Sequence, residues 1–218
     1  MMESLTAADG HQFECWMHPA QGTARGGIVI LQEIFGVTDQ LKGVAEMYAA
    51  EGYDVAIPAL FDRQAPGQVI SFDDAPKGRD LMLSADPGET MMDTDAAVQA
   101  LKAKGHKVGV MGFCWGGGLA LRAAQTLDVD AAVSFYGTRL TQYLDAPLRA
   151  PMQGHFGTHD DHTPREVLDE TKAYLPAFEM HLYEAGHAFA NDLRPSYVAE
   201  AADTAHARTK AFFATHLG

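Results

Sequence analysis

Short, strand-like hydrophobic runs alternate along the chain with stretches in which hydrophobic residues recur every three or four positions. A strand of a parallel sheet that is covered on both faces is hydrophobic almost without interruption, whereas a strand with one face in water alternates. The pattern therefore predicts an α/β fold with a mostly parallel central sheet and helices on both faces. Strands are expected at 28–31, 54–57, 107–111, 131–135, 152–156 and 178–183.

Helical spacing is clearest at three places along the chain. Hydrophobic residues within 41–48 lie on one helix face, and Thr38 or Asp39 stands where the cap of that helix belongs. A second stripe covers 119–123, and the last helix is expected at about 197–216. These helices separate the predicted strands, as parallel pairing requires.

Two segments depart from this alternation. Phe13, Cys15 and Met17 alternate with polar residues, which predicts a strand of antiparallel type with these three side chains on one buried face. The segment 61–89 carries three prolines, three glycines and only weak periodicity. It predicts a long excursion over a functional site rather than a linker between domains.

Length and composition favour one domain over residues 1–218, because 47% hydrophobic residues supply one substantial core. The net charge is −13, without a basic run, which argues against nucleic-acid or anionic-membrane partners and favours a small-molecule substrate. The start of the chain lacks a basic segment followed by a hydrophobic one, and no run of 18 hydrophobic residues occurs. We expect a cytoplasmic monomer or small homo-oligomer whose two cysteines, Cys15 and Cys114, are unpaired.

Cys114 stands on a predicted turn between a strand and a helix. Gly112 and Gly116 flank it, as glycines flank the serine in the Gly-x-Ser-x-Gly turn of α/β-hydrolases. Backbone N–H groups at the helix start, including that of Trp115, would face the sulfur and stabilise a thiolate or an oxyanion. A glycine-tight turn of this length also occurs without a catalytic role.

Two polar residues follow the last two predicted strands. Asp160 comes after the next-to-last strand and His187 after the last. The order Cys114, Asp160, His187 is the nucleophile, acid, base order of α/β-hydrolases. Asp161 is the alternative acid, because it is adjacent to Asp160. The three residues together predict a catalytic triad, although each of them alone would be read as a structural residue.

Six short motifs stand in order along nearly the whole chain: LQEIFG at 31–36, PALFDR at 58–63, GFCWGG at 112–117, SFYG at 134–137, FGTHD at 156–160 with Pro164 beyond it, and EAGHAF at 184–189. Together they resemble the dienelactone hydrolases (carboxymethylenebutenolidases), a cysteine-using branch of the α/β-hydrolases. The resemblance implies an α/β-hydrolase fold and the hydrolysis of a small lactone or ester without a cofactor. The implied catalytic residues are Cys114, His187, Asp160 and Glu33, with an oxyanion hole at the backbone amides of Ile34 and Trp115.

The resemblance further implies that Glu33 gates the thiol, which would rest neutral and protected from oxidation. A carboxylate directly after a hydrophobic strand is costly unless it is paired or protonated, which fits such a role. His187 alone could also form a thiolate–imidazolium pair with Cys114. The sequence leaves both versions open.

The family binds a substrate carboxylate through arginines, one of them four residues after the catalytic histidine. Here that position is Asn191, and an amide cannot form a bidentate, charge-assisted pair. Arg194, three residues later, and Arg79, in the region of the other arginine, are candidate replacements, although both could also be ordinary surface arginines. With Tyr136 of the SFYG motif, these residues are the candidate substrate contacts.

Two other classes of function compete with this reading. A cluster of nitrogen and oxygen donors could bind a divalent metal and make the protein a metal-dependent hydrolase. A catalytically silent relative that acts as a binding module is the second alternative, because a fold does not establish a function. The donors of the metal-binding alternative are His155, His159, Asp160, Asp161 and His162. A metal site built from them would leave the Cys114 turn without a role, so no metal is expected.

Overall fold

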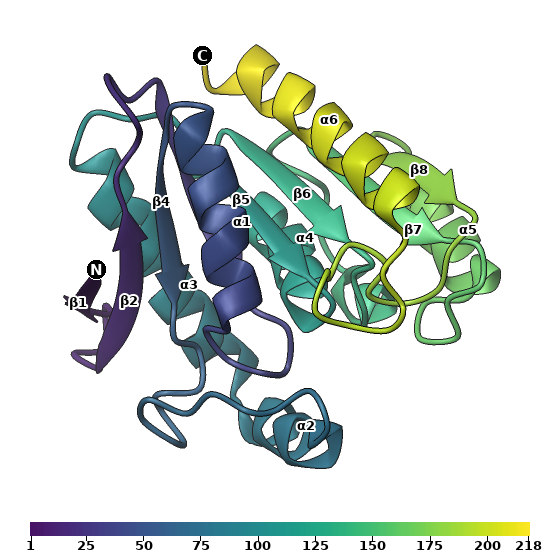
Figure 1. Ribbon diagram of the computed structural model, residues 1–218, viewed down its shortest axis with the longest axis horizontal. Helices are drawn as coiled ribbons and strands as arrows, with labels where there is room; N and C mark the ends of the chain where they lie inside the picture. Colours follow the sequence, from purple (N-terminus) through teal and green to yellow (C-terminus); the bar gives the residue numbers. More distant parts are fainter.

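The computed structural model describes residues 1–218 and contains eight strands, six α-helices and one short 3-10 helix (Figure 1). The strands are β1 (Met2–Thr6), β2 (Gln12–His18), β3 (Gly26–Leu31), β4 (Tyr53–Pro58), β5 (Val108–Phe113), β6 (Ala131–Phe135), β7 (Met152–Gly157) and β8 (Glu179–Tyr183). The helices are α1 (Asp39–Ala50), α2 (Ala75–Ser84), α3 (Pro87–Lys102), α4 (Trp115–Thr126), η1 (Leu140–Tyr143), α5 (Arg165–Tyr174) and α6 (Ala199–His216).

All eight strands form one sheet in the order β1-β2-β4-β3-β5-β6-β7-β8. The pairs β1–β2 and β2–β4 are antiparallel, and every other pair is parallel. The carboxyl ends of β3 and β5 to β8 therefore meet at one edge of the sheet, which is where open α/β sheets bind ligands. The fold is an α/β-hydrolase fold, as the sequence predicts.

Helices cover both faces of the sheet (Figure 1). α1 and α6 pack on one face and bury the cluster that includes Leu41, Tyr48 and Phe213. α3, α4 and α5 pack on the other and bury the cluster that includes Leu101 and Leu121. Strands β3 to β7 are buried along their whole length, which is why the sequence shows them as continuous hydrophobic runs.

The predicted strands are confirmed to within one or two residues at each end. Thr38 rather than Asp39 caps α1, since its Oγ1 accepts a hydrogen bond of 3.3 Å from the Leu41 N–H. On β2, Phe13, Cys15 and Met17 are buried and their neighbours are not, as the alternation predicts. None of the helices is both long and hydrophobic enough to cross a membrane.

The segment 61–89 contains more regular structure than its sequence suggests. It holds all of α2 and the first turn of α3, with Pro76 and Pro87 at helix starts, where proline is tolerated. α2 buries only Gly78, so it has no hydrophobic stripe that a periodicity search could detect. A Cβ at that glycine would collide with the Ile34 carbonyl, so α2 is in close contact with the loop after β3.

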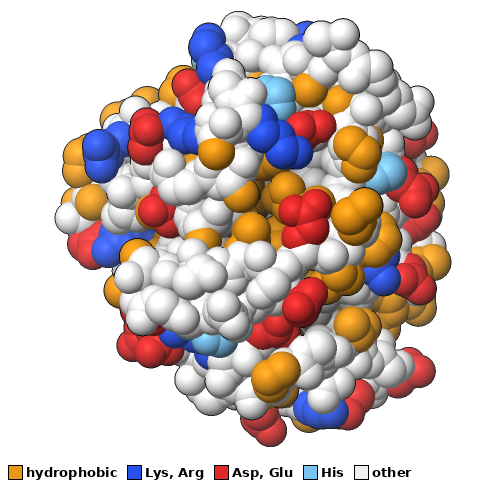
Figure 2. All heavy atoms as spheres, turned by 90° about the vertical axis from the view of Figure 1, so that its left-hand side faces the viewer, with side chains coloured by type: hydrophobic (Ala, Val, Ile, Leu, Met, Phe, Trp, Pro, Cys, Tyr) orange, Lys and Arg blue, Asp and Glu red, His pale blue; other side chains and the backbone are white.

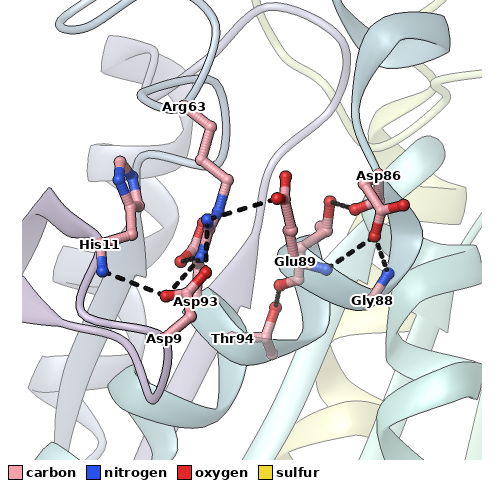
Figure 3. A network of polar contacts seen from close by, with 9 residues as sticks. Asp9, His11, Arg63, Asp86, Gly88, Glu89, Asp93 and Thr94 are labelled. Atoms are coloured by element: carbon pink, nitrogen blue, oxygen red, sulfur yellow. Dashed lines mark hydrogen bonds and ion pairs between the residues drawn. The ribbon is translucent and has the colours of Figure 1, made fainter.

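Arg63 holds the start of this segment in place (Figure 3). Its guanidinium donates to Asp93 of α3 at 2.8 and 2.9 Å and to Asp9 of the β1–β2 turn at 2.7 and 3.2 Å. Asp93 is buried, and burial raises its pKa against the opposing effect of Arg63. At the other end of the segment, Asp86 caps α3 by accepting from the N–H groups of Gly88 and Glu89.

Figure 2 looks onto the side of the molecule that carries β1 and β2. Acidic, basic and hydrophobic side chains are interspersed there, without a continuous basic area. The face offers no concentrated positive charge to a polyanion, in keeping with the net charge of the chain.

We expect Arg63→Ala to lower the free energy of unfolding by about 3 kcal/mol, because it leaves the buried Asp93 carboxylate without a cation. Arg165→Ala is the matched control: its partner Asp169 and the arginine are both well exposed, and the loss should stay below about 0.5 kcal/mol. Urea unfolding of both variants measures the difference. Equal effects would show that the Arg63 contacts do not anchor the segment.

Candidate active site

Cys114 lies on a strained turn between β5 and α4. Its backbone angles are φ 53° and ψ −114°, a region that side-chain-bearing residues rarely adopt. The turn needs both flanking glycines. A Cβ at Gly112 would overlap the carbonyl of Gly116, and a Cβ at Gly116 would overlap the carbonyl of Leu31. The thiol is partly exposed at the carboxyl edge of the sheet.

His187 and Asp160 meet beside this turn. Nδ1 of His187 is 2.8 Å from Oδ2 of Asp160, and Oδ1 of Asp160 accepts from the His162 N–H at 2.8 Å. Asp160 is fully buried, whereas Asp161 is exposed and makes no such contact. Burial alone would raise the pKa of Asp160, but the hydrogen bond from His187 outweighs it and the pKa is lowered. Of the two neighbouring aspartates, Asp160 is therefore the one that orients the imidazole.

The imidazole of His187 lies between an acid and a thiol. Burial lowers its pKa, but the hydrogen bond to Asp160 and the proximity of Asp160 and Cys114 outweigh this effect and raise the pKa to about 10. The contact with both partners makes an imidazolium–thiolate pair chemically accessible.

Glu33 is buried directly after β3 and faces the same centre. Its Oε2 accepts a hydrogen bond of 3.0 Å from Nδ2 of Asn191, which is itself fully buried. Burial raises the pKa of Glu33, and the charges of His187 and Arg194 oppose this effect in part. Oε1 of Glu33 is buried without a hydrogen-bond partner, so one acceptor of the site is left free.

Tyr136 completes the wall of the site at the end of β6. Its φ of 38° is also in the left-handed region, and its ring lies 5.2 Å from that of His187 in an edge-on arrangement. The hydroxyl is buried without a regular hydrogen-bond partner, and the charges of Glu33 and Cys114 help burial to raise its pKa. Tyr136 and Glu33 thus bring two unpaired polar atoms to the same place, which is typical of a site that rearranges around a ligand.

Two backbone amides at the site have no acceptor in the protein. The N–H of Trp115 is the first of α4 and that of Ile34 lies in the loop after β3, and neither donates a hydrogen bond. The Gly116 N–H donates to the Gln32 carbonyl at 3.0 Å and so ties the two loops together. Unused N–H groups at a helix start are suited to bind an oxyanion.

The two candidate arginines occupy different positions. Arg79 is exposed on α2 and its charge reaches His162. Arg194 is half-buried, with its guanidinium 5.4 Å from the Phe35 ring and 5.9 Å from the Phe72 ring, and its charge reaches Glu33. Asn191 does not line an open surface, because it is fully buried against Glu33.

The metal-binding alternative gains no support from this geometry. No group of three or more His, Cys, Asp or Glu side chains converges to hold a metal. His155 is buried beneath α6, where it contacts Tyr183 and Thr209, and His159 is exposed near Glu184. Side chains that are close in sequence, on a strand and in the turn after it, point in different directions and need not share a site. The sequence alone does not show these directions.

His162 is a neighbour of the site that the sequence does not single out on its own. Its ring lies 4.4 Å from that of His187, and burial and the charge of His187 lower its pKa. The sequence names it only as a member of the candidate metal-binding cluster, two residues after Asp160.

Comparison with known proteins agrees with the fold. The chain is similar to a putative dienelactone hydrolase from Klebsiella pneumoniae, with a TM-score of 0.84 and 24% identity over 98% of this chain and 99% of that one. It is 32% identical to carboxymethylenebutenolidase from Pseudomonas putida over 97% of this chain and 94% of the relative. It is also 34% identical to a putative carboxymethylenebutenolidase from Methylorubrum extorquens over 89% of this chain and 74% of the relative.

The strand order and the family match described next define an α/β-hydrolase fold. Residues 15–217 match the model of the dienelactone hydrolase family. The chain belongs to the dienelactone hydrolase family and is a hydrolase that acts on small esters or lactones.

The position of His187 between Asp160 and Cys114 predicts its titration. Because its pKa is raised above the value of about 6.5 in unfolded chains, the charged imidazole stabilises the fold fully below that pH, and this contribution is lost as the pH rises toward 10. Cys114→Ala removes one of the two contacts that raise the pKa, so the imidazole should titrate at lower pH. NMR titration of the His187 ring protons in both proteins measures this. An unchanged midpoint would mean that the thiol does not contact the imidazole.

Proposed function

We propose that the protein is a cysteine-dependent hydrolase that opens small lactones or esters through a thioester on Cys114. One arrangement carries the proposal: Asp160 is hydrogen-bonded to His187, and His187 lies beside the strained Cys114. The backbone amides of Ile34 and Trp115, which have no acceptor, lie at the same site. It supplies an oriented base, an exposed nucleophile and donors for the developing charge.

The first half of the reaction forms the acyl-enzyme. Sγ of Cys114 passes its proton to His187, directly or by way of Glu33, and attacks the carbonyl carbon, while the carbonyl oxygen becomes an oxyanion beside the amides of Ile34 and Trp115. The tetrahedral intermediate collapses, the carbon–oxygen bond of the ester breaks, and the departing oxygen takes a proton from His187. In a lactone the departing oxygen stays attached to the acyl chain.

The second half releases the acid. His187 takes a proton from a water molecule, the hydroxide attacks the thioester carbon, and the thiolate leaves and is protonated again. Asp160 keeps the imidazole in one orientation through both halves by its contact with Nδ1.

Two groups are placed to take the thiol proton. The raised pKa of His187 and its contact with Cys114 support His187 as the direct acceptor. Glu33, buried and held by Asn191, is suited to a gating role, because its charge depends on what surrounds it. A cytoplasmic location fits this chemistry, since a reducing compartment would keep both cysteines free.

Cys114→Ala should abolish ester hydrolysis and leave the fold intact, because the nucleophile is lost and nothing else is removed. Cys15→Ala is the control: this thiol is buried on β2 beside Met17 and should not affect turnover. Hydrolysis of a p-nitrophenyl ester by both variants measures this. If Cys114→Ala kept activity within about tenfold of wild type, about 1.4 kcal/mol of barrier, another group would be the nucleophile.

Asp160→Asn should lower kcat by about 10³ to 10⁴, because the histidine loses the partner that fixes its tautomer. Asp161→Asn changes the adjacent residue in the same way and should have a mild effect, since that side chain faces solvent. Steady-state kinetics of the two variants compare them directly. If Asp161→Asn lowered kcat more than Asp160→Asn, Asp161 would be the acid that orients His187.

Substrate preference should reflect the amide at Asn191. We expect kcat/KM for a carboxylate-bearing dienelactone to exceed that for a neutral ester of similar size by less than about tenfold, because a charge-assisted contact of about 1.5–3 kcal/mol is missing. The control variants are Arg79→Ala and Arg194→Ala. A strong preference for the dienelactone that either variant erases would assign the carboxylate contact to that arginine.

A further inference from the structure

A cavity of about 370 Å³ lies between α1, α6 and the loop that joins His187 to α6. It is separate from the proposed active site, because none of the catalytic candidates lines it. Twelve residues form its wall: a hydrophobic set of six, the buried polar pair Gln40 and His206, an acidic rim of Asp192 and Asp203, and Asp39 and Gly43 of α1. The hydrophobic set consists of Val44, Met47, Ala190, Leu193, Tyr197 and Ala202.

The buried polar pair is Gln40 and His206. The Gln40 side chain is only 5% exposed, and its Oε1 has no hydrogen-bond partner. His206 is 7% exposed and uses Nδ1 to contact the Tyr48 hydroxyl at 3.0 Å, which leaves its other ring nitrogen without a partner in the protein. Oε1 of Gln40 is closed off from solvent, so it does not face the open part of the cavity. The second ring nitrogen of His206 is not enclosed in this way and offers an unpartnered polar atom to a ligand.

The acidic rim carries uncompensated negative charge. Asp192 and Asp203 line the cavity and take part in no ion pair, and no lysine or arginine lines it. The two lysines nearby are each held by another acid: Lys42 lies 2.8 Å from Asp39, and Lys210 lies 2.7 Å from Glu51. Burial lowers the pKa of His206 to about 4, so its imidazole is neutral at physiological pH and adds no positive charge.

We propose that this cavity binds a small organic cation with a hydrophobic body, such as an arylalkyl ammonium ion. The hydrophobic wall accepts the body, Asp192 and Asp203 attract the charge, and the unpartnered ring nitrogen of His206 offers the ammonium group a polar contact. An anion would meet two carboxylates there, and a purely hydrophobic molecule would leave both carboxylates without a counter-charge.

The loop in the wall also reaches the proposed active site. Oδ1 of Asn191 accepts from the N–H of Leu193 at 3.1 Å, and its Nδ2 donates to Glu33. A ligand in the cavity would therefore contact the backbone that holds the Glu33 carboxylate.

Calorimetric titration with benzylamine at pH 7.5 and low salt tests the proposal, with neutral benzyl alcohol as the matched probe. We expect one saturable site for benzylamine and a Kd for benzyl alcohol at least about fivefold weaker. The Kd for benzylamine should be the same after Cys114 is blocked with iodoacetamide, which separates this cavity from the active site. Absence of saturable binding, equal affinity for the two probes, or loss of binding on blocking would overturn the proposal.

The double variant Asp192→Asn with Asp203→Asn should weaken benzylamine binding at least about fivefold and leave benzyl alcohol unchanged. The control, Asp169→Asn with Glu170→Gln on the exposed face of α5, removes the same charge elsewhere and should change neither Kd. Equal weakening in both double variants would mean that only the net charge of the protein attracts the cation.

Discussion

The strained backbone of Cys114 is the constraint on which the site depends. A φ of 53° is held only because β5 and α4 fix both ends of the turn and because Gly112 and Gly116 leave room for neighbouring carbonyls. This conformation brings the sulfur out at the carboxyl edge of the sheet and leaves the Trp115 amide without an acceptor. The packing of a sheet whose central strands are fully buried offsets the free energy of this strain.

The charges around the turn are arranged so that burial and hydrogen bonding oppose each other. Burial disfavours an ionised Asp160 and a charged His187, yet the contact between them reverses both effects. The partners of Glu33 are weaker: the neutral amide of Asn191 and the charges of His187 and Arg194. Burial therefore outweighs them, and the pKa of Glu33 is raised. The pKa values of the two carboxyl groups are thereby shifted in opposite directions, an arrangement by which such sites divide roles between two acids.

Much of the fold and of the candidate site could be predicted from the sequence, because both leave a pattern in it. Strands β3 to β7 are buried on both faces and so are continuous hydrophobic runs, and the turn at Cys114 requires glycines at fixed positions. β1 and α2 could not be predicted, since one is an exposed edge strand and the other buries a single glycine. Elements without a buried stripe have no periodic signal.

Contacts between residues far apart in the chain are equally hidden. The sequence marks Asn191 as the replacement of an expected arginine, but the hydrogen bond to Glu33 depends on where two loops meet in space. The proximity of His162 to His187 depends in the same way on the pairing of β7 with β8.

The central claim is that Cys114 carries the acyl group, and mass spectrometry of acid-quenched protein tests it most directly. With a p-nitrophenyl ester, whose leaving group needs no proton, His187→Ala should acylate slowly and deacylate more slowly still. The account predicts that the acyl mass accumulates on the peptide containing Cys114 and is absent when Cys114→Ala is added. Release of p-nitrophenol by the His187→Ala protein with no acyl adduct on that peptide, or an adduct that persists in the double variant, would contradict it.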